Sequence, residues 1–410
     1  MKIVIIIQYP SYNLFESLSV FCRNNGLGDI LNVLVPFGSS ITHPPIHSIA
    51  ELREYFDKHK LSYIIGCDDS GASRIKIQDL NPDVILLQVP YDLYRVNPEF
   101  KSDKLSQAAP VACVSYGASM IKHDFPYDGL ISNNEVYKNC SAIFVESNIL
   151  EKEYNQTYKD LRKFHSIGYG KCAKYFTTKN LTKNKNFRKT IAWKPRWIGT
   201  LGHSNLLKYL EFFLSYIAIN RDINFIFYSH PLLKKQLIDK EIATLEAVDE
   251  IFLRFRKSQN CIIVEDGDFL DQIMWADIYV GDFSSTLAEF FYTGKPIIYT
   301  PLNVTLNEFG TKIVEGCYTA SDTIEMEMHI RNLLASNDVK RDKRQALLKS
   351  MIEKENPIDA GKKLFEGITD FVIVPKKMAM PTTEHIRKER DLKVSTCAKN
   401  QTTECPEILN

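Results

Sequence analysis

The segment Ala276–Tyr299, which reads ADIYVGDFSSTLAEFFYTGKPIIY, has the pattern of a strand, a tight turn and a helix. Asp277–Val280 predicts a short buried strand, after which Gly281 and Asp282 carry the chain over the edge of its sheet. Ser284 is a favourable helix N-cap, and the residues after it place apolar side chains on one helical face: Leu287, Phe290 and Phe291. The segment therefore predicts one strand–helix unit of an α/β sheet.

The start of this predicted helix is a candidate anion site. Unsatisfied N–H groups and the positive end of the helix dipole would lie at Ser284, Ser285 and Thr286, where they favour a phosphate group. The carboxylate of Asp282 would repel a phosphate unless a hydroxyl, a cation or another donor stands between them. An ordinary capped strand–helix unit explains the same residues, so both interpretations stay open.

The composition is that of a globular protein of two ordinary domains. The chain has 410 residues, of which 44% are hydrophobic and 25% charged. Its 51 Lys and Arg residues nearly balance its 50 Asp and Glu residues, which argues against a nucleic-acid partner. Nine cysteines with no C-x-x-C pair favour neither a disulfide framework nor a zinc site. We therefore expect a cytoplasmic protein.

Residues 1–176 are predicted to form the first domain. Its apolar start, residues 1–8, is too short for a signal peptide or a membrane span and predicts a buried strand. Segments of helical period separate the short apolar runs, which are residues 3–7, 32–36, 62–65, 83–87, 111–115 and 142–145. This alternation predicts a mostly parallel sheet covered by helices. Residues 177–190 are polar and basic and predict a linker.

A second domain of the same kind is predicted for residues 191–373, ending in a closing helix, Ala360–Val372. The predicted fold class is therefore α/β, with two Rossmann-like domains. Periodicity is lost in residues 374–410, which predicts a disordered tail. Its Lys and Arg residues fit either a solvated tail or a peripheral contact with the anionic inner face of a membrane.

Polar residues follow four predicted strands of the second domain. They are Arg196, His230, Asp266 and the turn from Asp282 to Ser285. Parallel strands bring such positions to one edge of a sheet. An arginine fork, an imidazole and a helix N-terminus together suit a donor that contains a diphosphate. Each residue also has an ordinary structural explanation when it is taken alone. The sequence has neither a P-loop nor a G-x-G-x-x-G fingerprint, which argues against an ATPase or a dinucleotide dehydrogenase.

Two loops of the first domain also follow apolar strands. Tyr91 lies in one loop, and Tyr116 and Gly117 lie in the other. We take these three residues as acceptor-side candidates, because ligand-facing loops occur at such positions. The alternative is that both tyrosines are half-buried loop aromatics. Gly117 indicates a close approach of the backbone to another group.

The second domain resembles the CDP-glycerol glycerophosphotransferase family, which makes teichoic acids and related bacterial capsules. The resemblance is carried by His230-Pro231, Asp282-Phe283-Ser284-Ser285 and Gly294-Lys295-Pro296-Ile297-Ile298-Tyr299. It is clearest over residues 191–318 and weaker to about residue 372. The resemblance implies a GT-B arrangement that holds the nucleotide in the second domain. It also implies that His230, Asp282, Ser284 and Ser285 contact a CDP diphosphate, with Arg196 nearby.

One motif departs from that family. Its polymerases have a Trp-His-Gly motif with a catalytic histidine, whereas this chain has Ser115-Tyr116-Gly117. His123 is an alternative base, so the catalytic candidates are His230, Asp282 and His123. We expect transfer of a phosphoglycerol-like or other phosphoryl-linked group from a CDP-activated donor to a glycan or lipid-linked acceptor. The alternatives are a nucleotide-sugar glycosyltransferase and a non-catalytic subunit of a capsule assembly complex. No cofactor is expected, and no second carboxylate stands at metal-ligand spacing from Asp282.

Overall fold

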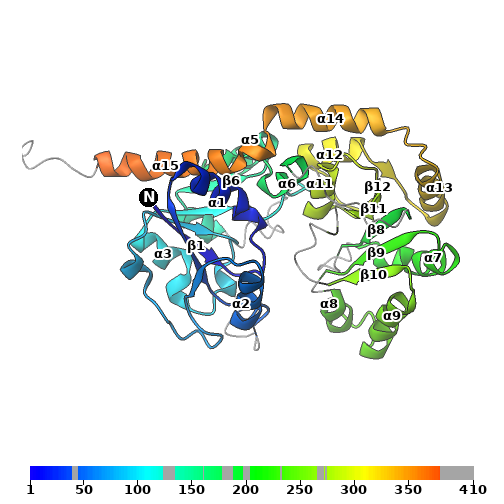
Figure 1. Ribbon diagram of the computed structural model, residues 1–410, viewed down its shortest axis with the longest axis horizontal. Coiled ribbons are helices and arrows are strands. Elements are labelled where there is room, and N and C mark those ends of the chain that lie inside the picture. Colours follow the sequence, from blue (N-terminus) through cyan, green and yellow to red (C-terminus); the bar gives the residue numbers. More distant parts are fainter. Residues whose placement is uncertain are drawn as a thin grey trace, which may run out of the picture.

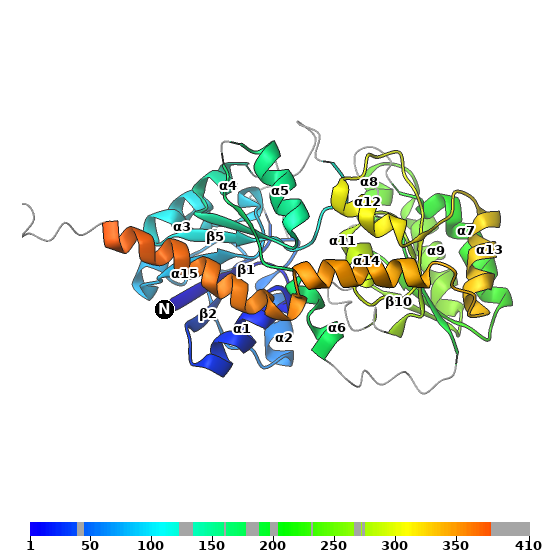
Figure 2. The same ribbon diagram turned by 90° about the horizontal axis from the view of Figure 1, so that it is seen from above.

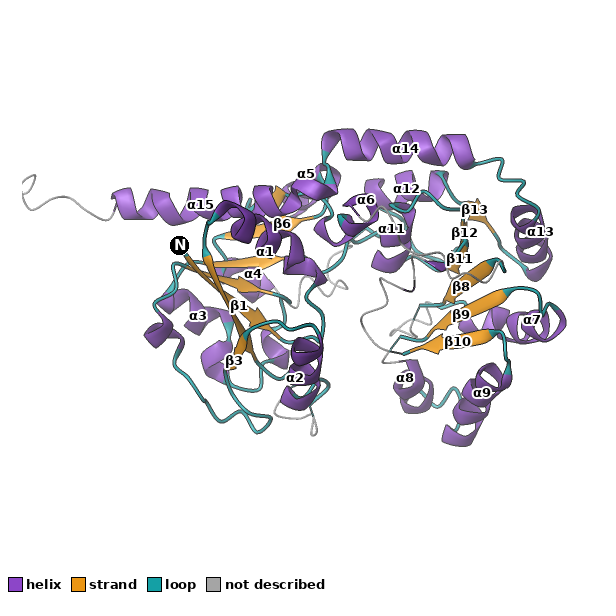
Figure 3. Ribbon diagram, in the orientation of Figure 1, coloured by secondary structure: helices purple, strands orange, loops and turns teal. Residues whose placement is uncertain are grey.

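A computed structural model of the chain shows two lobes, each built on its own parallel sheet (Figures 1 and 3). The structure describes residues 1–38, 45–122, 134–159, 161–177, 188–196, 204–230, 233–265, 272 and 275–378. The predicted fold class, two α/β domains with parallel sheets, is confirmed.

The first sheet has seven strands in the order β3-β2-β1-β4-β5-β6-β7, and each neighbouring pair is parallel. Short apolar runs form strands that are buried on both faces, as parallel sheets require. The strands are β1 (Lys2–Ile7), β2 (Asp29–Leu34), β3 (Tyr63–Ile65), β4 (Val84–Leu87), β5 (Val111–Val114), β6 (Ala142–Val145) and β7 (Phe164–Ser166).

Helices cover both faces of the first sheet. One face packs against α1 (Asn13–Asn25), α2 (Ile49–Lys58) and the C-terminal helix α15 (Ala360–Met378). The other face packs against α3 (Ser102–Ala108), α4 (Asn134–Asn139) and α5 (Asn148–Thr157). The apolar side chains of β1 alternate between the two faces of the sheet. Ile5 packs on the face covered by α1, α2 and α15, and Ile6 packs on the face covered by α3, α4 and α5.

The second sheet has six parallel strands in the order β10-β9-β8-β11-β12-β13. The strands are β8 (Thr190–Lys194), β9 (Asn224–Tyr228), β10 (Cys261–Val264), β11 (Ile278–Gly281), β12 (Ile297–Tyr299) and β13 (Tyr318–Thr319). Four helices pack on one face: α7 (Leu206–Ile219), α8 (Leu233–Asp239), α9 (Leu245–Lys257) and α13 (Thr323–Leu334). The other face packs against α11 (Ser285–Phe291) and α12 (Glu308–Glu315).

The C-terminal part of the chain joins the two lobes. Seen from above, α14 (Arg341–Lys354) lies over the second lobe, and α15 continues along the first (Figure 2). Leu364 and Ile368 of α15 are buried in the core that α1 and β1 share. The closing helix therefore packs on the first domain.

Several details differ from the sequence analysis. Strands β7, β12 and β13 were not predicted, because they are only two or three residues long and show no clear alternation. The predicted linker falls mostly outside the described residues, and Thr190 at its end already belongs to β8. Helix α15 extends to Met378, and the rest of the predicted tail, residues 379–410, lies outside the described residues. None of the helices in the described ranges has the length and apolar character needed to cross a bilayer.

Candidate functional site

The strand order of the second sheet reverses between β8 and β11. In open α/β sheets, ligands bind outside the carboxyl ends of the strands at such a switch point. Lys194 is the last residue of β8, and Arg196 follows this strand. Asp282 follows β11, and His230 follows the neighbouring β9. The structure thus brings the predicted residues Arg196, His230 and Asp282 to one edge. Asp266 and His123 lie outside the described residues.

Asp282 is the most buried of these groups, with 1% of its surface exposed. Its Oδ2 accepts hydrogen bonds from the backbone N–H groups of Arg196 at 2.9 Å and Asn205 at 3.1 Å. Its Oδ1 accepts from the Asn205 Nδ2 at 3.0 Å and from the Thr300 hydroxyl at 2.5 Å. The carboxylate therefore holds both ends of the β8–α7 loop. Its catalytic role stays a prediction.

Three basic side chains form what we call the cationic cluster: Lys194, Arg196 and His230. Burial lowers the pKa of the Lys194 ammonium to about 8. Burial, together with the positive charges of Lys194 and Arg196, lowers the pKa of His230 to about 3. The imidazole is therefore neutral at physiological pH and able to donate a hydrogen bond. Lys194 and Arg196 carry the positive charge of the cluster, and both disfavour protonation of His230, so the cluster has a positive potential suited to an anion.

Lys194 was missed as a site residue in the sequence analysis. The structure places it as the last residue of β8, paired in register with Gly281. The guanidinium of Arg196 is held over the ring of Phe283, 4.6 Å from its centre. The sequence did contain a signal for Lys194 as a site residue: it is a basic residue at a strand end, two positions before the predicted Arg196.

The start of α11 forms as predicted. Ser284 is the N-cap, and its hydroxyl accepts a hydrogen bond from the Leu287 N–H at 3.2 Å. Ser284 and Ser285 are partly exposed, whereas Thr286 is buried. Phosphate binding at this turn stays a prediction, and Ser284 and Ser285 are the two of its residues that solvent reaches.

The acceptor-side candidates of the first domain lie together. The hydroxyl groups of Tyr91 and Tyr116 are 2.5 Å apart, and 45% of the Tyr116 surface is exposed. Tyr116 is close enough to Arg196 to interact with its charge. Gly117 packs against Ser285, so the loops of the two domains meet. The structure therefore places the predicted acceptor and donor sides next to each other.

The switch point of the first sheet, between β1 and β4, is filled by a side chain. The Gln88 Oε1 accepts hydrogen bonds from the N–H groups of Gln8 and Tyr9, both at 2.8 Å. Its Nε2 donates to the Ser11 carbonyl at 2.6 Å. An amide that ties these backbone segments together occupies the place a ligand would take, so the second sheet is the better candidate for a nucleotide.

Comparison with solved structures identifies the arrangement of the two domains. A glycosyltransferase from Rickettsia africae is 14% identical, with a TM-score of 0.54, over 91% of this chain and 98% of that one. UDP-GlcNAc 2-epimerase from Neisseria meningitidis, bound to UDP-GlcNAc, is 12% identical, with a TM-score of 0.56, over 90% and 100%. The wall teichoic acid polymerase TagF, in a variant soaked with CDPG, is 12% identical, with a TM-score of 0.54, over 90% and 89%.

The chain has a GT-B fold. Identities this low establish the fold alone. No protein-family model matches the sequence, and no curated protein matches it. The GT-B arrangement implied by the family resemblance is confirmed, whereas the narrower CDP-glycerol family stays a prediction.

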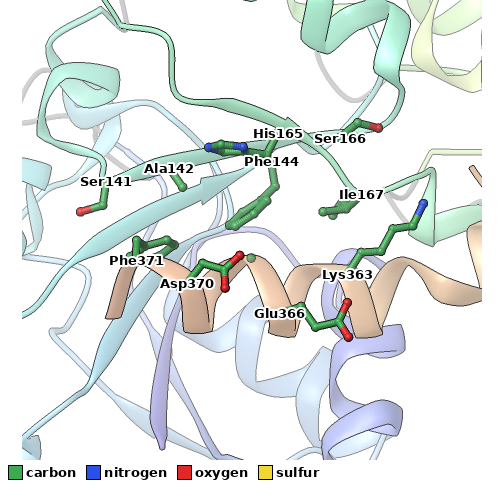
Figure 4. A pocket seen from close by; sticks show the side chains of 11 residues that line it. Ser141, Ala142, Phe144, His165, Ser166, Ile167, Lys363, Glu366, Asp370 and Phe371 are labelled. Carbon is green, nitrogen blue, oxygen red and sulfur yellow. The ribbon is translucent and has the colours of Figure 1, made fainter. Parts of the chain in front are cut away.

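A groove of about 580 Å³ lies elsewhere on this GT-B fold. It runs between β6, β7 and α15 of the first domain (Figure 4). Phe144 and Phe371 form part of its wall, and His165, Lys363 and Glu366 are among its polar groups. None of the predicted site residues lines it. We therefore place the candidate site at the junction of the two domains, where the predicted residues converge.

Glu146 is a buried carboxyl that the sequence analysis missed. It follows β6 at the carboxyl edge of the first sheet and has only 4% of its surface exposed. It lines a narrow crevice with Ser115 and Lys171. Burial raises its pKa to about 7. A carboxyl poised near neutral pH beside the predicted acceptor side is a candidate proton acceptor. No local pattern marks it, because its burial comes from α1 and α15.

We expect Glu146→Gln to stabilise the protein at pH 8 by roughly 2–3 kcal/mol and to have little effect at pH 4. The fold raises the carboxyl pKa from 4.5 to about 7, so the folded state holds this proton more tightly. The resulting stability is complete below pH 4.5 and is lost as the pH rises through 7. Glutamine stays neutral throughout. Urea unfolding of both proteins at the two pH values measures the difference, and an equal effect at both would contradict the assignment.

Proposed function

We propose that this protein is a transferase that moves a phosphoglycerol-like or other phosphoryl-linked group from a CDP-activated donor to a hydroxyl of a bacterial surface glycan or lipid-linked acceptor. The observation that carries the proposal is the cationic cluster at the switch point of the second sheet, which faces the Tyr91–Tyr116 pair. The GT-B fold shared with TagF, whose structure was determined after a soak with CDPG, supports a nucleotide-linked donor.

In the proposed reaction, the acceptor oxygen attacks the distal phosphorus of the donor. The bond between that phosphorus and the bridging oxygen breaks, and CMP leaves with the electron pair. Negative charge then grows on the leaving phosphate. Lys194 and Arg196 supply positive charge there, and the neutral His230 supplies a hydrogen bond. Preorganised donors of this kind stabilise a transition state most strongly where charge develops.

The acceptor's proton needs a base other than the histidine of the Trp-His-Gly motif, which this chain lacks. Tyr116 stands at the place of the motif histidine, and burial raises the pKa of Glu146 to a value suited to proton transfer. His123 stays a second candidate. We propose that a carboxylate, rather than an imidazole, takes this proton.

Two other functions fit the same cluster. A glycosyltransferase that uses a nucleotide sugar would also need positive charge beside a leaving phosphate, and the Rickettsia glycosyltransferase shares the fold. A non-catalytic nucleotide-binding subunit is favoured by the Tyr116 replacement of the motif histidine. Binding measurements do not separate these functions, since each includes a nucleotide site.

Analysis of the released nucleotide separates them. The purified protein is incubated with a glycan or lipid-linked acceptor and, in turn, CDP-alditols, other CDP-linked donors and nucleotide sugars. We expect CMP from a CDP-linked donor, because the bond between the two phosphates breaks. Release of UDP or GDP from a nucleotide sugar, or of CMP from a CMP-sugar, would show glycosyl transfer. Measurable CDP binding without turnover of any donor would favour the non-catalytic subunit.

A further inference from the structure

The loop after β5 crosses from the first domain to the second. The Lys122 N–H donates a hydrogen bond to the Thr305 carbonyl at 2.9 Å, and the Asn307 N–H donates to the Met120 carbonyl at 3.0 Å. Residues 121 and 306 form an antiparallel bridge between these bonds. We call residues 119–122 and 305–310 together the interdomain seam. Through it, a loop that begins in the first sheet is held by the second domain.

Two glycines let the backbones touch at either end of this loop. A Cβ atom on Gly310 would lie 2.1 Å from the Met120 carbonyl oxygen, and one on Gly117 would lie 2.6 Å from the Ser285 Cβ. Real Cβ atoms do not approach other atoms so closely, so neither position has room for a side chain. The loop is therefore held close to the second domain at both ends.

Asn307 links the seam to a helix start. Its Oδ1 accepts a hydrogen bond from the Gly310 N–H at 2.7 Å and thereby caps α12. Its Nδ2 donates to the Ser119 carbonyl at 3.0 Å, in the other domain. The Asn307 side chain is buried. Removing its amide donor would therefore leave the Ser119 carbonyl without this hydrogen bond, beside a side chain that water does not easily reach.

A buried network holds the loop between its two ends. The Glu289 Oε1 of α11 accepts hydrogen bonds from the Tyr169 hydroxyl at 3.0 Å and the Lys171 Nζ at 2.9 Å. The Tyr169 hydroxyl accepts from the Ala118 N–H at 3.2 Å, and the Lys171 Nζ donates to the Tyr116 carbonyl at 2.8 Å. A carboxylate of the second domain therefore orients the backbone on both sides of Gly117.

We propose that Asn307 is a positioning residue, which acts through the interdomain seam to set where Tyr116 lies relative to the cationic cluster. The inference rests on the proposed function, because it assigns Tyr116 to the acceptor side of the reaction. The second domain holds both the cluster and the loop, so these contacts fix the distance between Tyr116 and Arg196. This accuracy matters, since misplacing a reacting group by about 1 Å can reduce a rate about 100-fold.

Asn307→Asp tests the proposal. The carboxylate still accepts from the Gly310 N–H and caps α12, but it has no donor for the Ser119 carbonyl and repels it. Asn97→Asp is the matched control. The Asn97 Oδ1 also caps a helical turn, by accepting from the Glu99 N–H at 2.8 Å, and its Nδ2 donates to the Ser73 hydroxyl at 2.6 Å within the first domain.

Hydrogen exchange followed by mass spectrometry gives a readout independent of activity. We expect the peptide covering residues 115–122 to exchange about tenfold faster in Asn307→Asp than in the wild type, the factor that corresponds to losing one hydrogen bond. Asn97→Asp should leave this peptide unchanged. Gly310→Ala, which adds one methyl group against the Met120 carbonyl, should act in the same direction as Asn307→Asp. Unchanged exchange in both seam variants would overturn the proposal.

Kinetics test the positioning role itself. Asn307→Asp should lower kcat about tenfold or more while changing the Kd for CDP less than about twofold, because the cationic cluster is intact. Faster exchange with unchanged kcat would show that the seam is only structural and would overturn the proposal. A wild-type protein that neither binds CDP nor turns over a donor would refute the proposed function instead. The exchange result would then still decide whether Asn307 holds the loop.

Discussion

Asp282→Ala is expected to lower the free energy of unfolding by about 3–5 kcal/mol. The substitution removes the acceptor of four hydrogen bonds at a site with 1% exposure. The donors left behind belong to Arg196, Asn205 and Thr300, and each buried donor without a partner costs about 1–3 kcal/mol before relaxation. The β8–α7 loop would also lose its attachment, so the variant should bind CDP more weakly.

Asp277→Ala is the matched control for this experiment. Asp277 precedes β11, and its carboxylate accepts from the Thr190 N–H at 2.9 Å, but 33% of its side chain is exposed. Water replaces much of what is lost there, so we expect a cost of about 1 kcal/mol or less. Urea unfolding followed by circular dichroism measures both variants. Equal losses of unfolding free energy in the two variants would contradict the conclusion that Asp282 holds the β8–α7 loop.

Lys194→Met is expected to weaken CDP binding about 10- to 100-fold at pH 7, the value of one hydrogen bond to a charged group. Methionine keeps the apolar stem of the side chain and removes the ammonium. Lys189→Met is the control, because Lys189 lies just before the other end of β8, where its Nζ is 3.6 Å from Asp277. Calorimetry with CDP measures each Kd. A loss in Lys194→Met no larger than in the control would remove Lys194 from the site.

The pH dependence of CDP binding gives the same prediction a second test. Burial lowers the pKa of Lys194 to about 8 in the free protein, and a bound anion favours the protonated form. Affinity should therefore be greatest below pH 8 and fall by up to about tenfold per unit above it. The terminal phosphate of CDP, with a pKa of about 6, is already ionised in that range. In Lys194→Met this decline should be absent, and a decline of the same size in both proteins would contradict the assignment.

Local patterns in the sequence were sufficient for the parallel α/β class and for the start of α11. Apolar runs such as residues 3–7 and 142–145 became strands close to the predicted bounds, because burial on both faces requires continuous apolar residues. Ser284 became the N-cap, since its hydroxyl satisfies an N–H group within its own turn. These interactions are made within a few residues, so the sequence displays them directly.

The composition of the site needed the tertiary structure. Arg196, His230 and Asp282 were expected to converge because they follow parallel strands. Lys194 was missed because a lysine near a strand end is common, and the lowering of its pKa comes from burial in the folded chain. Glu146 was missed for the same reason, since its sequence neighbours do not reveal the helices that exclude water from it.

By itself, the sequence determined most of the strands, the parallel class of both sheets and the strand ends where polar residues stand. Only the tertiary structure decided the order of the strands, the partners of Asp282 and the attachment of the Tyr116 loop to the second domain. The physical reason is the distance along the chain. Capping and periodicity act over one or two turns, whereas Asn307 and Ser119 are 188 residues apart and meet only when both domains are packed.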